Sequence, residues 1–141
     1  LGEIEQSKGI IQSQINSINR SNKTTISALH KSKELALEMY DSLKSNDLTK
    51  FSDIMNKSWE AKRNFTKGVS NKRIEMVSKK AIEKGAKSLK VTGAGGGGHF
   101  FVYADPSKHS SIIKSLKKLG VNSVDFKYQN QGAKIFEINN L

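Results

Sequence analysis

The spacing of apolar residues changes near Gly85 and divides the chain into two parts. Before Gly85 the apolar residues recur at the period of an α-helix, and after it they alternate as they do along β-strands. We therefore expect a helical part over residues 1–85 and a sheet-containing part over residues 86–141. Because 141 residues are enough to bury one core, the pattern predicts a single α+β domain, in which a bundle of about four helices packs on a small, mostly antiparallel sheet.

Four amphipathic helices are expected before Gly85. The first two cover residues 3–19 and 24–43. Asp47 and Asn71 can cap the third and fourth helices with their side chains, and Gly85 can end the fourth. The residues expected to face inward are, helix by helix, Ile4, Ile11, Ile15 and Ile18; Leu29, Ala36, Met39, Tyr40 and Leu43; Leu48, Phe51, Met55 and Trp59; and Ile74, Val77, Ala81 and Ile82.

The part after Gly85 is expected to have the order β-loop-β-α-β-β. Strands are predicted near residue 90 and at 100–104, 124–128 and 133–138. Residues 100–104 are apolar on both faces, which is typical of a covered, central strand. Asp105 and Pro106 are a cap and first-turn pair for the helix that follows, and Gly120 can end that helix.

A run of six small residues joins the first two expected strands. It consists of Gly93, Ala94, Gly95, Gly96, Gly97 and Gly98. Gly93, Gly95 and Gly98 match the spacing G-x-G-x-x-G, but a dinucleotide fingerprint needs a helix directly after the glycines, and here a strand follows. His99 and Phe100 stand where a P-loop needs Lys and then Ser or Thr. The catalytic motifs that accompany the glycine loop of a protein kinase do not occur in these residues.

The remaining interpretation is a strand, a glycine loop and a strand. Backbone N–H groups in such a loop can form an anion-binding nest without help from a helix dipole. We expect the anion to be a phosphate, and we expect a side chain at Gly95 or Gly97 to obstruct it. The alternative is a mobile hairpin turn that binds nothing.

The net charge of +11 indicates an anionic partner. Only three of the 24 basic residues are arginines, and the lysines are scattered over every expected helix, which argues against nucleic acid as that partner. We expect solvated lysine faces that draw in anionic small substrates. The alternative is a stand-alone basic binding module for nucleic acid or another polyanion. A third possibility is assembly, as in a homodimer, through the helical stripe from Ile4 to Ile18.

Lys62 and Arg63 form a second candidate site. They precede the capping residues Ser70 and Asn71 and could hold a phosphate at the N-terminus of the fourth helix. A helix C-terminus followed by an ordinary cap would give the same pattern.

The sequence gives no indication of a metal site, a disulfide or a membrane segment. His30, His99 and His109 are not spaced like metal ligands, so no metal-ligating residue is predicted. Cysteine is absent, which excludes disulfides and thiolate metal sites. The sequence contains no stretch that resembles a membrane span or a signal peptide, so we expect a cytoplasmic protein without a membrane partner.

Taken together, the segments resemble the C-terminal half of the GHMP small-molecule kinases, named for galacto-, homoserine, mevalonate and phosphomevalonate kinases. The similarity is strongest to the branch of D-glycero-D-manno-heptose phosphate (7-phosphate) kinases. The glycine run matches the third sequence motif of the family, which closes over the nucleotide phosphates and the substrate pocket. The segments that carry the resemblance are Leu29–Ala36, Ser58–Lys62, Gly68–Asn71 with Ile74, Gly85–Ala86, Lys90–Gly98 and Gln131–Ile135.

The resemblance implies phosphoryl transfer from ATP, with Mg²⁺, to a heptose phosphate destined for a cell-surface polysaccharide. It implies that Gly93–Gly98 contact the nucleotide and that Lys62 and Arg63 contact the sugar phosphate. The first two family motifs and the catalytic residues belong to an N-terminal, ATP-binding half that is not in these residues. The expected partners are therefore ATP, a sugar phosphate and that N-terminal half, and we expect this chain alone to be inactive, because phosphoryl transfer depends on positioning by both walls of the site.

Overall fold

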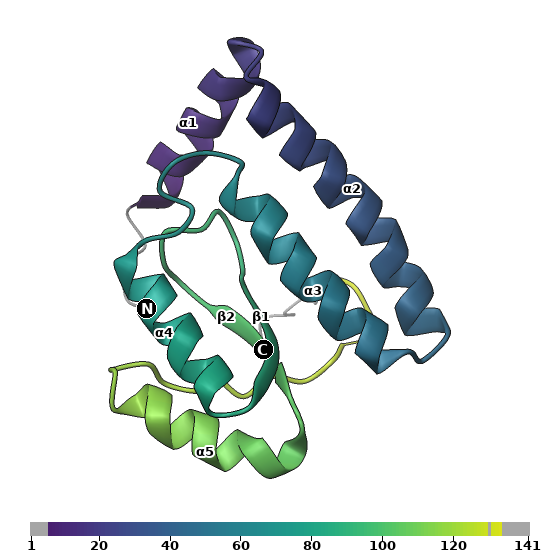
Figure 1. Ribbon diagram of the computed structural model, residues 1–141, viewed down its shortest axis with the longest axis vertical. Coiled ribbons are helices and arrows are strands. Elements are labelled where there is room, and N and C mark those ends of the chain that lie inside the picture. Colours follow the sequence, from purple (N-terminus) through teal and green to yellow (C-terminus); the bar gives the residue numbers. More distant parts are fainter. Residues whose placement is uncertain (1–5, 130, 134–141) are drawn as a thin grey trace, which may run out of the picture.

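The computed structural model describes residues 6–129 and 131–133, and Figure 1 shows how their elements are arranged. The elements are α1 (Gln6–Asn19), α2 (Lys23–Lys44), α3 (Leu48–Arg63), α4 (Lys72–Glu83), β1 (Ala86–Val91), β2 (Phe100–Ala104) and α5 (Pro106–Lys117). Helices α1 and α2 meet at one end and diverge from it, α3 lies between α2 and β1, and α4 contacts both β1 and α5 (Figure 1). The structure confirms the predicted α+β arrangement of helices packed on a small antiparallel sheet.

Side-chain caps begin two of the helices as predicted. The Asp47 carboxylate accepts a hydrogen bond from the Lys50 N–H at 2.9 Å, and the Asn71 side-chain oxygen accepts one from the Ile74 N–H, also at 2.9 Å. The expected cap of α5 is different. The Asp105 side chain makes no capping bond and instead accepts a hydrogen bond from Lys87 at 2.9 Å.

The sheet is a hairpin whose connecting loop contains the glycine run. Strand β1 pairs antiparallel with β2, so that Ala86 lies opposite Ala104 and Val91 opposite Phe100. A hydrogen bond of 2.9 Å from the Thr92 N–H to the His99 carbonyl closes the base of the loop. This bond joins the two ends of the loop, so that the loop starts and finishes at the end of the paired strands.

The core beneath this loop joins four elements and the segment before α4. One group of buried residues fills the space between α4, α5 and the sheet, and a second lies under the glycine loop. The second group consists of Ile10, Trp59, Val69, Ile74 and Val91. It connects α1, α3, α4 and β1 through Val69, which is fully buried.

The predicted inward face of α2 is wrong in part. Ala36, Tyr40 and Leu43 are exposed, whereas Leu29 and Met39 are half-buried. The helix packs on α3 through a different set of residues, of which three are small or polar and allow the two helices to approach closely. The buried set is Thr25, Ala28, Leu35 and Ser42.

Most of the other predicted core residues are confirmed. Phe51 is half-buried, and the fully buried ones are Met55, Trp59, Ile74, Val77 and Ala81. Leu48 and Ile82 are exposed, contrary to prediction. On α1 the described isoleucines of the predicted stripe are also largely exposed, because the helix turns the neighbouring Ile10 inward instead.

The predicted third strand is not formed. Residues 124–128 pair with no other strand in the described part of the chain, and Phe126 instead packs its ring near those of Phe101 and Tyr128, with centroids 6.1 and 5.7 Å apart. Without that strand, β2 has β1 as its one described neighbour and remains partly exposed, so it is not the covered, central strand predicted. In the predicted fourth strand, Ala133 is not in a strand and residues 134–138 lie outside the described residues.

Candidate functional site

The glycine loop adopts a backbone that requires glycine. Gly93, Gly95, Gly96 and Gly98 have φ angles of 70°, 104°, 76° and 82°, in the left-handed region that residues with a side chain rarely occupy. The run of glycines therefore reflects the course of the main chain. It is not a low-complexity linker.

The middle of the loop is fastened to the segment that precedes α4. The Gly96 N–H donates to the Val69 carbonyl at 2.9 Å, and the Asn71 side-chain N–H₂ donates to the Gly96 carbonyl at 2.8 Å. Asn71 therefore holds the loop with its nitrogen and caps α4 with its oxygen. These contacts argue against the mobile hairpin turn considered above.

Gly95 is restricted by packing against the protein itself. A Cβ atom at this position would lie 2.8 Å from the Val69 carbonyl oxygen and 2.9 Å from the Val69 Cα. A side chain at Gly95 would therefore first meet the Val69 backbone, and the expectation that it would obstruct a phosphate stays a prediction. A Cβ at Gly93 or Gly98, by contrast, would have no atom within 4 Å.

Lys62 enters the site from α3 and holds the start of the loop. The residue is only 8% exposed, and its ammonium donates to the Val91 carbonyl at 3.0 Å and also to the Gly93 carbonyl. Burial, with a smaller contribution from the nearby charge of Lys90, lowers the pKa of Lys62 to about 8. In this structure the ammonium points at the loop backbone. The predicted contact of Lys62 with the sugar phosphate stays a prediction.

Polar side chains continue along the contact between α3 and β1. Lys90 donates to the Ser58 hydroxyl at 2.5 Å, and burial lowers the pKa of Lys90 as well. One turn and a half earlier on α3, Ser52 donates to Ser88 at 3.1 Å, and both residues are buried. Helix α3 is thus attached to β1 by hydrogen bonds that fix its register along the strand.

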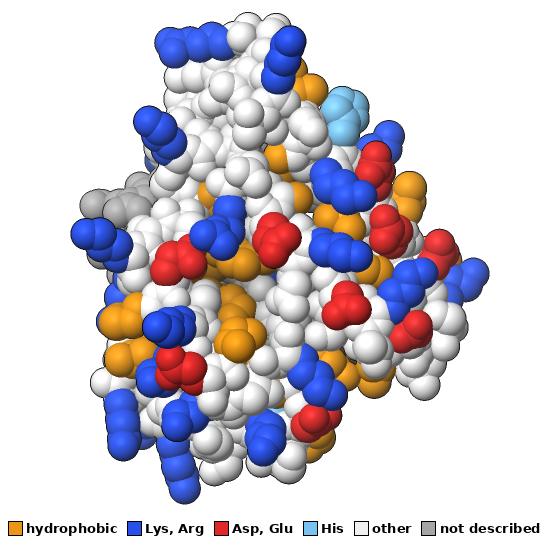
Figure 2. Space-filling view, in the orientation of Figure 1, with side chains coloured by type: hydrophobic (Ala, Val, Ile, Leu, Met, Phe, Trp, Pro, Cys, Tyr) orange, Lys and Arg blue, Asp and Glu red, His pale blue; other side chains and the backbone are white. Residues whose placement is uncertain are grey.

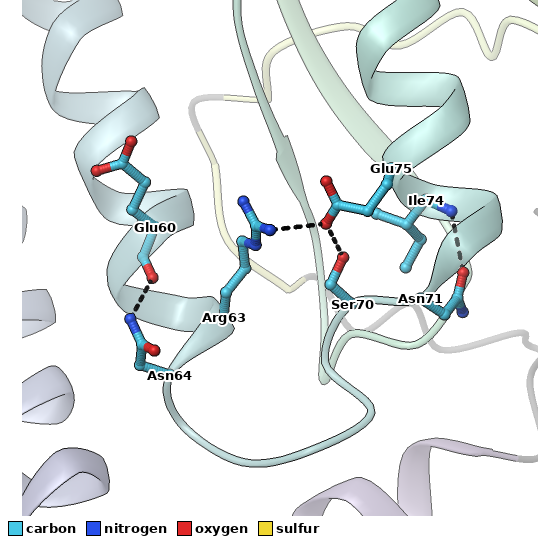
Figure 3. A network of polar contacts seen from close by, with 7 residues as sticks. All are labelled: Glu60, Arg63, Asn64, Ser70, Asn71, Ile74 and Glu75. Atoms are coloured by element: carbon cyan, nitrogen blue, oxygen red, sulfur yellow. Dashed lines mark hydrogen bonds and ion pairs between the residues drawn. The ribbon is translucent and has the colours of Figure 1, made fainter.

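Arg63 points in another direction, toward the first turn of α4. Its guanidinium pairs with the Glu75 carboxylate at 3.1 Å, and that carboxylate also accepts a hydrogen bond from Ser70 (Figure 3). Arg63 borders an open groove of about 630 Å³ between the end of α3 and the segment before α4. The lining residues are Glu60, Arg63, Asn64, Thr66, Lys67, Gly68 and Ser70. The glycines of the loop do not line this groove, so the two predicted sites do not share one pocket.

Three backbone N–H groups of the loop make no hydrogen bond within the described residues, and Gly97, which carries one of them, is itself buried. Among the amides from Ala94 to Gly97, only that of Gly96 donates to a carbonyl, and those of Ala94, Gly95 and Gly97 have no partner within the described residues. Unpaired amides in a loop with left-handed residues are the usual components of an anion nest, although here the bonded Gly96 amide separates that of Gly97 from the other two. The geometry therefore suits an anionic ligand with several oxygen atoms.

The surface charge is dispersed. Figure 2 shows Lys and Arg side chains spread over one face of the molecule with Asp and Glu side chains among them. Such a face differs from the continuous basic stripe that grips a nucleic-acid backbone. The polyanion-binding alternative stays an untested prediction.

The described residues offer no ligand set for the expected Mg²⁺. No group of three His, Cys, Asp or Glu side chains gathers in the described ranges. The one carboxylate near the start of α4, Glu75, is engaged by Arg63 and Ser70. Mg²⁺ stays a prediction, and no step proposed below depends on it.

The fold and the loop together define the C-terminal domain of a small-molecule kinase. Residues 39–122 match the family described as GHMP kinases C terminal, which is more than half of the chain. The chain belongs to the GHMP kinase family, as the resemblance implied, and the matched residues include α3, α4 and the whole glycine loop.

Two curated relatives show which members of the family it resembles. The chain is 36% identical over 114 residues to a D-glycero-alpha-D-manno-heptose 7-phosphate kinase of Campylobacter jejuni, a match covering 81% of this chain and 34% of the relative. It is 28% identical over 109 residues to a galactokinase of Pyrococcus furiosus, covering 77% of this chain and 30% of that protein. This chain therefore spans about a third of the length of these relatives.

A solved structure shows the same fold. The mevalonate kinase of L. major, crystallised in complex with R-mevalonate, superposes with a TM-score of 0.66 at 19% identity, covering 79% of this chain and 34% of that one. At this identity the likeness concerns the fold alone.

Sequence reasoning found the glycine loop and Asn71 but missed what connects them. Val69 is an ordinary apolar residue in the sequence, and only the fold reveals that its carbonyl and Cα limit the space at Gly95. The contact between Lys90 and Ser58 was also missed, because the two residues are separated by 32 residues and no local pattern links them.

Proposed function

We propose that this chain is the C-terminal part of an ATP-dependent sugar-phosphate kinase, in which residues 93–98 bind the nucleotide phosphates. The observation that carries the proposal is the fixed glycine loop, whose amides at Ala94, Gly95 and Gly97 have no partner among the described residues. Membership of a kinase family supports phosphoryl transfer as the reaction.

The proposed acceptor is a heptose phosphate. The heptose 7-phosphate kinase of Campylobacter jejuni supports this assignment, because at 36% identity it matches four fifths of the chain. The galactokinase relative supports a sugar as the wider substrate class. The groove beside Arg63 and Lys67 is a place where an anionic sugar could bind, because Lys67 lines it together with Arg63, which is paired with Glu75, and with one carboxylate, that of Glu60.

The contribution of this chain is to bind and orient. In the proposed complex, the loop amides donate to the phosphate oxygens of ATP, which supplies the transferred phosphoryl group. The left-handed glycines let the backbone approach these oxygens closely. Donors fixed in advance need no rearrangement as negative charge shifts during transfer, which is how such loops favour the transition state. The remaining wall and the catalytic residues would come from the rest of a polypeptide as long as the relatives, and we propose that this part alone is inactive.

A charge placed at the edge of the loop tests the proposal. In the full-length kinase, Gly98→Asp and Gly98→Asn add side chains of nearly equal size into open space, and both tolerate a positive φ. We expect Gly98→Asp to weaken ATP binding at least about tenfold, because its carboxylate repels the phosphates, and Gly98→Asn to weaken it much less. Isothermal titration of ATP measures both. Equal affinities for the two variants would place the loop away from the nucleotide.

A further inference from the structure

The glycine loop is held by two side chains that donate hydrogen bonds to its carbonyl oxygens; below, this pair of contacts is called the grip. Lys62 of α3 grips the Gly93 carbonyl, together with that of Val91, and Asn71 grips the Gly96 carbonyl. These side chains reach the loop from 31 and 25 residues away in the sequence, so the grip depends on the tertiary fold.

Each gripped carbonyl shares a peptide unit with an unpaired amide. The Gly93 carbonyl and the Ala94 N–H belong to one planar group, as do the Gly96 carbonyl and the Gly97 N–H. In a trans peptide the two bonds point in opposite directions. Fixing the oxygen of such a unit therefore also fixes the direction of its N–H.

We propose that Lys62 is a positioning residue that aims the Ala94 amide at the ligand phosphate, and that Asn71, through the Gly96 carbonyl, anchors the buried Gly97 side of the loop. This inference rests on the proposed function for the identity of the ligand, but the grip itself is a property of the loop. It assigns Lys62 a role different from the sugar-phosphate contact that its place in the sequence indicated.

Burying the Lys62 ammonium without an ion-pair partner costs free energy, which a residue with only a structural role would not need to spend. This ammonium is buried and forms none of the ion pairs found among the described residues, so backbone carbonyl dipoles alone compensate its charge. The charged group acting on it is Lys90 of β1, which is also cationic. An apolar side chain would avoid this cost, whereas a buried cation beside the loop also attracts a phosphate.

This arrangement makes nucleotide binding dependent on pH. The pKa of Lys62 is lowered to about 8, so the residue loses its proton as the pH rises through that value, and with it the charge that attracts phosphate. Affinity for ATP should therefore fall between pH 7.5 and pH 9.5. Lys90 titrates in the same direction, so only the difference between variants reports on Lys62.

The test uses the full-length kinase with Lys62→Met, which removes charge and donor, and Lys62→Gln, which keeps a donor without charge. Lys50→Met, at an exposed position on the same helix, is the matched control. Hydrogen exchange of residues 92–98 without nucleotide measures the grip, and ATP titrations at pH 7.5 and 9.5 measure its consequence. If Lys62→Met fails to fold, Lys62→Gln supplies both measurements.

We expect loop exchange about tenfold faster in Lys62→Met than in wild type, less change in Lys62→Gln, and none in the control. ATP affinity should fall about tenfold from pH 7.5 to 9.5 in wild type and Lys50→Met, and clearly less in both Lys62 variants. Unchanged loop exchange in Lys62→Met, or the same pH dependence in all four proteins, would overturn the inference. If wild type binds no ATP while Lys62→Met still loosens the loop, the proposed function fails and the positioning of the Ala94 amide stands.

Discussion

The glycine loop and α1 lie on the same buried cluster but are held very differently. The loop is fixed by Lys62, Val69 and Asn71, each of which contacts a particular backbone atom. Helix α1 is anchored mainly by the buried Ile10 and by a hydrogen bond of 2.7 Å between Ser13 and Thr66. The comparison shows that the loop is held at individual backbone atoms, whereas α1 is held mainly along one face.

The largest loss of stability among these predictions is expected from a substitution at Gly95. Gly95→Ala should lower the free energy of unfolding by about 3 kcal/mol, because the new Cβ would collide with the Val69 backbone at a φ of 104°. Gly93→Ala is the matched control, since its Cβ meets nothing within 4 Å and only the φ of 70° is unfavourable, at about 1 kcal/mol. Urea unfolding followed by the fluorescence of the single tryptophan, Trp59, measures both. Equal losses would mean that the loop is not packed on Val69 in solution.

A smaller effect is expected where the loop is fastened by a single side chain. Asn71→Asp keeps the oxygen that caps α4 but replaces the donor to the Gly96 carbonyl by an acceptor. We expect a loss of about 1 kcal/mol in the same unfolding measurement, after the favourable effect of a carboxylate at a helix N-terminus is included.

Asp47→Asn provides the comparison for Asn71→Asp at a cap that contacts no loop. It exchanges the same two side chains at the start of α3, where the oxygen accepts from the Lys50 N–H. Both residues are good caps, so the expected change is within about 0.5 kcal/mol. Because this exchange runs in the opposite direction, a change at Asn71 equal in size and opposite in sign to that at Asp47 would show that the hydrogen bond to Gly96 contributes nothing to stability.

The difference between the two regions also explains what the sequence could predict. As helix caps, Asp47 and Asn71 act within a few residues of their own position, so the caps, most helix boundaries and the two paired strands follow from local patterns. The glycine loop could also be predicted from the sequence, because its left-handed backbone requires glycine and the run of glycines marks its position. These features determined the fold class and the location of the candidate site.

Features that depend on distant partners could not be predicted in this way. Nothing near Lys62 indicates that its ammonium meets carbonyls of β1 and the loop. On α2, the apolar pattern favoured Tyr40 and Leu43, whereas close packing with α3 selected small and polar residues such as Ala28 and Ser42. Residues 124–128 alternate like a strand but have no strand partner in the described part of the chain. In each case the structure depends on a partner that is distant in the sequence, which a local pattern does not reveal.

The smallest effect is expected on the outer face of α1. Ile11, Ile15 and Ile18 are 50, 43 and 40% exposed, so Ile15→Gln should change the free energy of unfolding by no more than about 0.5 kcal/mol. Ile10→Ala, on the opposite face, removes buried contacts and should cost about 2 to 3 kcal/mol. A loss above 1 kcal/mol for Ile15→Gln would mean that this face is covered in solution. Light scattering over a concentration series would then distinguish self-association, the assembly predicted for this stripe, from a constant molecular mass, in which case part of the same polypeptide covers the face.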